Sequence, residues 1–477
     1  MHKPLQSLTF ALLVFLALGL LSFSFPKDGI SVSSNLKLEF PSLATLFGEK
    51  TEKKDISKIL DAVDKIDTTF AINDTSNVVS KKDSSAVVLN TNIQTTNKAA
   101  LKSFFDALTE LKNNPKAIRV LHYGDSQIEG DRITDYLRLK LQGQFGGHGP
   151  GLISLMPIAP SVINKISNGP GWDRYNVFTN KDKRVPHSNF GVLASINRFA
   201  GYKKLSDSSA VINSSISVTT TKGGGANAQA YKKLKLFYGG AQAKTWCEFY
   251  DGPALVSADS LEEGGSFRIK EYNVGNGSNT HQLKFAGKDS PDFYAISLES
   301  ETGVLVDNIG LRGSSGTFFH QINNGQLKQF YDYLNVKLII LQFGGNATPS
   351  IKDEKTAINY AGYLRSQINI VKKAAPNASI LFIGPADMSI KNGTVYETYP
   401  FLESTRNEIK KVVLESGCAF FDMYDCMGGK NSMAGWVDQK LAATDYIHFS
   451  PQGARKIATL LYSALINEYN AYLKTNK

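Results

Sequence analysis

Two short polar segments, far apart in the chain, carry side chains that can perform acyl transfer. The tripeptide Gly-Asp-Ser occupies 124–126, and Asp445 and His448 lie three residues apart near the C-terminus. A serine hydroxyl is a weak nucleophile that a neighbouring base has to activate. An imidazole serves as this base when a carboxylate fixes its tautomer and orientation. We therefore expect Ser126 to be the nucleophile, with His448 as its base and Asp445 folded back onto one ring nitrogen.

Two further turns carry donors for the negative oxygen that forms during acyl transfer. Gly313 and Asn346 each follow an apolar run. Donors that are placed in advance around this oxygen are a major source of rate enhancement. The backbone N–H groups of Ser126 and Gly313 and the side-chain amide of Asn346 would supply three. Gly310 and Gly316 lie close to Gly313 and are alternatives to it.

The strands that carry these residues are indicated by continuous apolar runs, which are typical of fully buried parallel strands. They lie at 117–123, 304–311, 336–343, 379–388 and 418–424. Helical spacing recurs around them, at 99–115, 131–145, 322–334, 359–375, 401–416 and 451–473. Open α/β sheets form their sites at the carboxyl ends of the strands. The candidate residues come at such ends or in the last loop, so the pattern predicts one α/β domain with its site there.

A different pattern interrupts this domain. Between 161 and 302, short alternating stretches are separated by turns rich in Gly, Asn, Ser and Asp, which predicts an antiparallel β-sandwich. The α/β domain is therefore expected to be discontinuous, at 99–160 and 303–477, with an inserted sandwich at 161–302 that could bind carbohydrate.

The N-terminus predicts export. Residues 5–25 are uncharged and largely apolar, and about 20 such residues span a bilayer as a helix. Residues 1–25 are thus a signal anchor or a signal peptide, and the lack of a small-residue cleavage pattern favours the anchor. Residues 26–98 are polar and predict a flexible tether, in which Asp55–Ile66 alone has the spacing of a short amphipathic helix. We expect an exported protein, periplasmic or at the cell surface, tethered to the membrane by residues 5–25.

The net charge indicates which polymers the protein could bind, and the cysteine count indicates whether disulfides stabilise it. The net charge is +10, and the segment 26–100 is neutral, so the excess lies in the folded part. A basic face attracts anionic polymers, but no nucleic-acid motif is present and we expect no nucleic-acid partner. The three cysteines are too few for a disulfide scaffold, although Cys418 and Cys426 could pair. We expect no metal and no cofactor.

The order of these blocks resembles a known family. Gly-Asp-Ser after a strand, glycine in a second block, Gly-Gly-Asn in a third and Asp-x-x-His near the C-terminus resemble the SGNH (GDSL-like) hydrolases. The stretches 124–151 and 427–439 are similar to bacterial peptidoglycan O-acetylesterases, a subgroup with an inserted β-sandwich. Two departures are Gln127, where the family's GDSL motif has Leu, and Ala347, where its GxND motif has Asp.

The resemblance implies a flavodoxin-like α/β/α sandwich around a central parallel sheet. It implies Ser126 as nucleophile and first oxyanion donor, and His448 and Asp445 as base and partner. It also implies Gly313 and Asn346 as the remaining oxyanion donors.

The activity implied is removal of O-acyl groups, most simply acetyl, from a cell-envelope polysaccharide such as peptidoglycan. Three alternatives stay open: a polysaccharide O-acetyltransferase, an acetylxylan-type esterase, and a non-catalytic carbohydrate-binding protein. His148, His320 and Trp436 are secondary candidates for substrate contacts.

Overall fold

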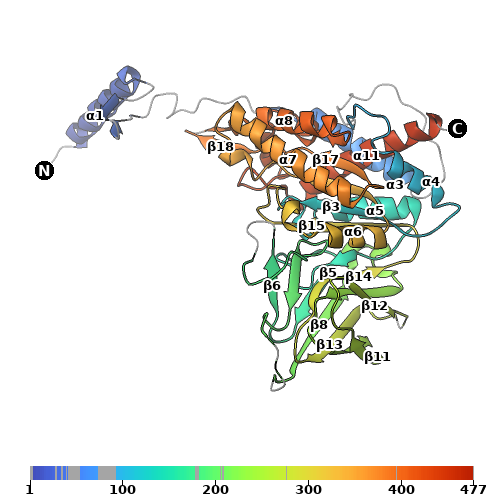
Figure 1. Ribbon diagram of the computed structural model, residues 1–477. Coiled ribbons are helices and arrows are strands. Elements are labelled where there is room, and N and C mark those ends of the chain that lie inside the picture. The colour runs from blue at the N-terminus through green and yellow to red at the C-terminus, as the bar shows by residue number, and fades with distance from the viewer. Residues whose placement is uncertain are drawn as a thin grey trace.

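The computed structural model describes residues 4–26, 30–33, 36–38, 40, 54–73, 93–177, 182–204, 206, 209–275, 277–393 and 395–475. Figure 1 shows an α/β part, which holds the C-terminus, above a part built from strands. Helix α1 (Pro4–Ser24) lies apart from both (Figure 1). The predicted α/β fold with an antiparallel insert and an N-terminal apolar helix is confirmed.

The centre of the α/β part is a parallel sheet in the order β15-β3-β16-β17-β20. Its strands are β3 (Ile118–Gly124), β15 (Val304–Gly310), β16 (Val336–Gln342), β17 (Ser379–Ile383) and β20 (Ala419–Phe421). Gly310 and Gln342 are both in register with Gly124, and Ile383 is in register with Gln342. The strands therefore end level with one another, and the loops that follow them meet at one edge of the sheet.

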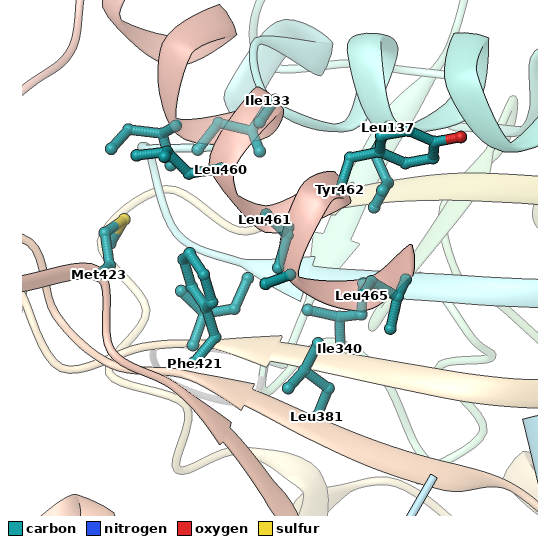
Figure 2. Packing of buried hydrophobic residues seen from close by; sticks show 14 of the residues in the cluster. Ile133, Leu137, Ile340, Leu381, Phe421, Met423, Leu460, Leu461, Tyr462 and Leu465 are labelled. Atoms are coloured by element: carbon teal, nitrogen blue, oxygen red, sulfur yellow. The ribbon is translucent and has the colours of Figure 1, made fainter. Parts of the chain in front are cut away.

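Helices cover both faces of this sheet, because successive strand residues point to opposite sides. On one face Ile340, Leu381 and Phe421 pack against α5 (Thr134–Phe145) and α11 (Pro451–Thr475), as Figure 2 shows. On the other face, their neighbours along the strands pack against α6 (Asn324–Tyr333), α7 (Glu354–Ala374) and α8 (Leu402–Glu415). Each fully buried Leu or Phe stabilises the fold by about 1.5–3 kcal/mol.

Smaller elements complete the α/β part. They are α4 (Lys102–Glu110), α9 (Met423–Met427), α10 (Ser432–Asp438) and the hairpin strands β18 (Ser389–Asn392) and β19 (Val395–Thr398). Short 3-10 turns lie at Glu129–Asp131, Lys222–Gly224, Asn227–Gln229, Phe319–Gln321 and Thr348–Ser350. All three cysteines, Cys247, Cys418 and Cys426, are free and buried, so the considered pairing of Cys418 with Cys426 is not formed.

The insert consists of two antiparallel sheets, ordered β11-β10-β13-β8-β5 and β12-β9-β14-β7-β6, with β4 also paired to β14. The strands are β4 (Gly151–Ile153), β5 (Asn164–Asn168), β6 (Asp173–Asn176), β7 (Ser195–Arg198), β8 (Ile212–Thr220), β9 (Lys233–Gly239), β10 (Thr245–Asp251), β11 (Ala254–Leu261), β12 (Arg268–Asn273), β13 (Thr280–Gly287) and β14 (Asp292–Glu299). Strand β4 lies in the range expected to belong to the α/β domain, so the boundary at 160 needs correcting. The sequence did not indicate this strand, because its three residues are too few to show an alternating pattern.

Buried charges join the insert to the parallel sheet. Arg119 of β3 donates to Asp307 of β15 at 2.9 and 3.1 Å, and it also forms an ion pair with Glu299 of β14. Lys235 of β9 pairs with Glu299 at 2.8 Å. The parallel sheet and the insert are therefore parts of one folded body.

The range expected to be a tether is partly folded. Helix α3 (Ser57–Asn73) buries Val63, and the preceding Ile56 is buried in the same core cluster. Lys456 of α11 pairs with Asp64 of α3 at 2.6 Å. Gln94 forms a backbone bridge to Phe420, with N···O distances of 2.8 and 2.9 Å. A flexible tether is therefore wrong for 54–73 and for the residues after 92, because an amphipathic helix buries its apolar face wherever a matching surface exists. Residues 41–53 and 74–92 lie outside the described residues.

Candidate active site

The structure brings together three residues from opposite ends of the α/β part. Ser126 Oγ lies 2.8 Å from His448 Nε2, although 322 residues separate them in sequence. His448 Nδ1 lies 2.7 Å from Asp445 Oδ2. Ser126 follows β3, and the other two residues stand in the turn that precedes α11. With Nδ1 donating to the carboxylate, Nε2 is free to accept the serine proton.

The turn that holds Asp445 and His448 is built by the carboxylate itself. Asp445 Oδ1 accepts the backbone N–H groups of Ile447 at 2.9 Å and His448 at 3.0 Å. Tyr446, between them, has φ +58°, which L residues rarely adopt. Burial works to raise the pKa of Asp445, but the hydrogen bonds from His448 and Ile447 outweigh it and lower the pKa. Asp445 is thus an anion at neutral pH and can stabilise an imidazolium.

Gln127 ties the nucleophile turn to this second turn. Its Nε2 donates to the carbonyl of Ile447 at 2.6 Å, and its Oε1 accepts the N–H of Phe449 at 3.3 Å. These two backbone groups flank His448 on both sides. The sequence showed Gln127 only as a departure from the family's GDSL motif, and nothing in the pattern indicated which partners its amide would find.

The candidate oxyanion donors surround Ser126. Among the residues described, the N–H groups of Ser126 and Gly313 have no acceptor inside the protein. Gly313 adopts φ +78°, which suits glycine. The N–H of Gly316 already donates to Ser314 Oγ at 3.1 Å, which favours Gly313 over this alternative. Gly310 is the last residue of β15 rather than part of the turn after it.

Asn346 lies near Ser126, but its side-chain amide already donates hydrogen bonds to two acceptors. Its Nδ2 lies 2.8 Å from Asp125 Oδ2 and 3.2 Å from the carbonyl of Ser314. Both amide hydrogens therefore have acceptors, and one of them must be shared or redirected when an oxyanion forms. Catalytic hydrogen bonds are often redistributed in this way on substrate binding.

Asp125 supports both Asn346 and the nucleophile turn. It is 4% exposed and accepts the N–H of Gln127 at 2.9 Å as well as the amide of Asn346. Burial raises its pKa to about 6, although the hydrogen bonds from Gln127 and Asn346 and the charge of His448 act in the other direction. Asp125 thus supports the side chain of Asn346, although the Asp of the family's GxND motif is absent at position 347.

Residues 274–456 match the GDSL-like lipase/acylhydrolase family. The chain carries a GDSL-like lipase/acylhydrolase domain. The matched range includes Gly313, Asn346, Asp445 and His448, whereas Ser126 precedes it and reaches them only through the fold. The domain is that of a carboxylic ester hydrolase, and no curated protein matches the sequence.

Solved structures resemble large parts of the chain of this hydrolase. A structure of a peptidoglycan O-acetylesterase shares 20% identity, covers 80% of this chain and 99% of its own, and has a TM-score of 0.61. An acetyl xylan esterase shares 17% identity over 34% of this chain and 81% of its own, with a TM-score of 0.27. A family two carbohydrate esterase from Cellvibrio japonicus shares 11% identity over 65% of this chain and 99% of its own, with a TM-score of 0.23. The first likeness shows that the two proteins share a fold, and the other two TM-scores are too low to support an argument.

A pocket opens beside Ser126 and His448 in this hydrolase. The other polar side chains that line it are those of Asp125, Gln127, Gln342 and Asn346. The rest of its wall is largely apolar, formed by Phe343, Pro349, Pro385, Ala386, Met388, Met423 and Ile447. Such a wall accepts the hydrocarbon part of an acyl group and excludes a charged one.

The secondary candidates lie away from this pocket. Trp436 is fully buried and donates to the carbonyl of Met427 at 3.0 Å, so it has a packing role. His148 and His320 are not among the residues that line the pocket. His122 is buried between Gln342 and Thr134, each at 3.0 Å, and burial lowers its pKa to about 4. It is therefore a neutral core residue.

Proposed function

We propose that this hydrolase is a serine esterase that removes O-acetyl groups from a cell-envelope polysaccharide, with peptidoglycan as its substrate. The observation that carries the proposal is the chain of contacts from Ser126 Oγ through His448 to Asp445, at 2.8 and 2.7 Å, beside an open pocket. Nucleophile, base and orienting carboxylate are each within hydrogen-bond distance of the next, as acyl transfer requires.

The reaction proceeds in two halves. His448 Nε2 takes the proton of Ser126 Oγ as that oxygen attacks the acetyl carbonyl, and the oxyanion accepts the N–H groups of Ser126, Gly313 and Asn346. The intermediate collapses when His448 returns the proton to the sugar oxygen, which leaves acetyl-Ser126. Water then attacks this ester while His448 takes its proton, and acetate leaves as Ser126 regains a proton.

Several features support a polysaccharide substrate outside the cytoplasm. Helix α1 is long and apolar enough to cross a membrane, and only 6% of its apolar window is buried. It is proposed to anchor the chain there, so that the folded part stands on the outer side. The net charge of +10 favours an acidic polymer such as peptidoglycan. The likeness to a peptidoglycan O-acetylesterase extends over 80% of this chain, and we propose that the inserted sandwich holds the glycan.

The exposure of the site favours water over a second sugar as acyl acceptor. The side chains of Asp445 and His448 are 47% and 32% exposed, so the acyl-enzyme stands open to solvent. A transferase has to keep water away from this intermediate, and a binding protein has no need for the aligned hydrogen bonds. Both alternatives are therefore less well supported than hydrolysis.

The test is acetate release from O-acetylated peptidoglycan and from acetylated xylan by the detergent-solubilised full chain. We expect release from peptidoglycan, and a loss of several orders of magnitude in the Ser126→Ala variant. Release from xylan alone would retain the mechanism and change the substrate. Acetate release that survives in Ser126→Ala would contradict the assigned nucleophile.

A further inference from the structure

A hairpin that takes no part in the reaction contacts the turn between Asp445 and His448. Strands β18 and β19 follow β17 and pair through the register Ser389–Thr398 and Asn392–Val395. Tyr396 of β19 stacks face to face on Tyr446, with ring centroids 3.5 Å apart and an interplanar angle of 6°. The hairpin therefore packs directly on the residue that follows Asp445.

Tyr446 needs such support. Its backbone has φ +58°, and non-glycine residues keep this conformation only where their surroundings hold it. Two contacts with the hairpin do so. One is the stack on Tyr396, and the other is the hydrogen bond from Ser389 N–H to the Tyr446 carbonyl at 3.0 Å. Because Asp445 is 47% exposed, burial alone does not fix the turn.

The hairpin is itself firmly held at its base. Asp387, which is fully buried, accepts Thr398 Oγ1 at 2.7 Å and the N–H of Met433 at 2.8 Å. The N–H of Thr398 donates to Asn431 Oδ1 at 3.0 Å. These bonds join the base of the hairpin, at Asp387 and Thr398, to the residues at the start of α10, so the hairpin is held in place there.

We propose that Tyr396 is a positioning residue, which acts through Tyr446 to keep Asp445 and His448 aligned with Ser126. This inference rests on the proposed function. Without the ring of Tyr396, Tyr446 relaxes towards negative φ and the Asp445 carboxylate turns away from His448 Nδ1. Tyr396 itself does not line the acyl pocket, so we expect its loss to act on the rate of reaction rather than on substrate binding.

The first test compares hydrolysis of p-nitrophenyl acetate by variants of the full chain. In Tyr396→Ala we expect kcat to fall by about tenfold to a hundredfold, as for a misplaced catalytic group, with KM unchanged. Tyr396→Phe retains the flat ring and should keep wild-type kcat. Ile390→Ala is the matched control, since this residue lies on the same hairpin and is 41% exposed. Wild-type kcat in Tyr396→Ala, or a raised KM at unchanged kcat, would overturn the inference.

A second comparison does not depend on how the hairpin variants fold. Tyr446→Ala loses the stack and is still strained at φ +58°, so its backbone relaxes, whereas Tyr446→Gly loses the stack but adopts φ +58° freely. We expect the glycine variant to be the more active, although its side chain is smaller. The reverse order would overturn the inference. Ser126→Ala is measured alongside, because activity that persists there contradicts the proposed function rather than the role of Tyr396.

Discussion

At the scale of single residues, the site depends on amide and carboxyl groups that do not react. Gln127 holds the backbone on both sides of His448, and Asp125 holds Asn346. Gln127 thereby positions the turn that carries His448, and Asp125 positions Asn346, the candidate oxyanion donor. Changes at these two positions should alter the rate or the pH dependence of stability without removing the nucleophile.

Replacing Gln127 by Leu restores the residue of the family's motif but removes the two hydrogen bonds to the His448 turn. We expect kcat for p-nitrophenyl acetate to fall by about tenfold, because each lost bond leaves a backbone group unpaired and the imidazole less fixed. Steady-state kinetics measures this change. The control is Gln242→Leu, at an exposed position in the insert. An unchanged kcat in Gln127→Leu would show that the two hydrogen bonds from Gln127 to the His448 turn are dispensable.

Asp125 should make stability depend on pH. Its pKa of about 6 in the folded state lies above the ordinary value of 3.8. Between these two pH values the folded state therefore keeps a proton that the unfolded chain has lost. Stability is therefore lost as pH rises through this window, by about 3 kcal/mol in total. In Asp125→Asn this loss is absent. Urea unfolding at pH 4 and pH 8 measures the free energy of unfolding of wild type and variant. The difference between the two should grow with pH.

The control for this experiment is Glu263→Gln, which alters an exposed carboxylate in the insert. If wild type and Asp125→Asn keep the same difference in unfolding free energy at both pH values, the carboxyl group is not titrating in this window.

At the scale of elements, docking of α3 extends the hydrophobic core beyond the parallel sheet. Ile56 is 3% exposed beside the start of α3, and it approaches Gly428 and Gly435 around α9 and α10. We expect Ile56→Ala to cost about 2–5 kcal/mol of unfolding free energy, the usual range for a buried isoleucine. Denaturant unfolding measures it. Ile358→Ala, at a 53% exposed position on α7, should change stability by less than about 0.5 kcal/mol.

Equal unfolding midpoints for Ile56→Ala and wild type would mean that α3 is not docked in solution. The same result would restore the simpler description of residues 54–73 as part of a tether.

At the scale of the whole molecule, the insert and the parallel sheet share one buried ion cluster. Arg119 is 1% exposed, and Asp307 and Glu299 neutralise it from two different sheets. Asp307→Asn leaves part of this charge unpaired and should cost about 3–5 kcal/mol. Unfolding should remain a single transition, because the cluster joins both parts. Asp332→Asn, in an exposed pair with Lys328, is the control and should have a small effect.

Two separate unfolding transitions in wild type would contradict this description of one body. A stable Asp307→Asn variant would show that water or neighbouring dipoles compensate Arg119 instead.

The sequence alone indicates the fold class, because apolar periodicity is a local property that burial imposes on each strand and helix. It also placed Ser126, Gly313, Asn346, Asp445 and His448 at strand ends or in the last loop, since parallel strands expose their carboxyl ends at one edge. Their catalytic roles stay predictions until Ser126→Ala and its partners are measured.

The contacts that hold these residues in place became apparent only in the folded protein. The clamp by Gln127, the two acceptors of Asn346, the stack of Tyr396 on Tyr446 and the docking of α3 all join positions far apart in the chain. An amide or a tyrosine can satisfy itself in many ways, and its partner is chosen by where the folded backbone brings another group within reach. The pairing of β4 with β14 has the same origin, because three residues carry too little pattern to indicate a partner strand.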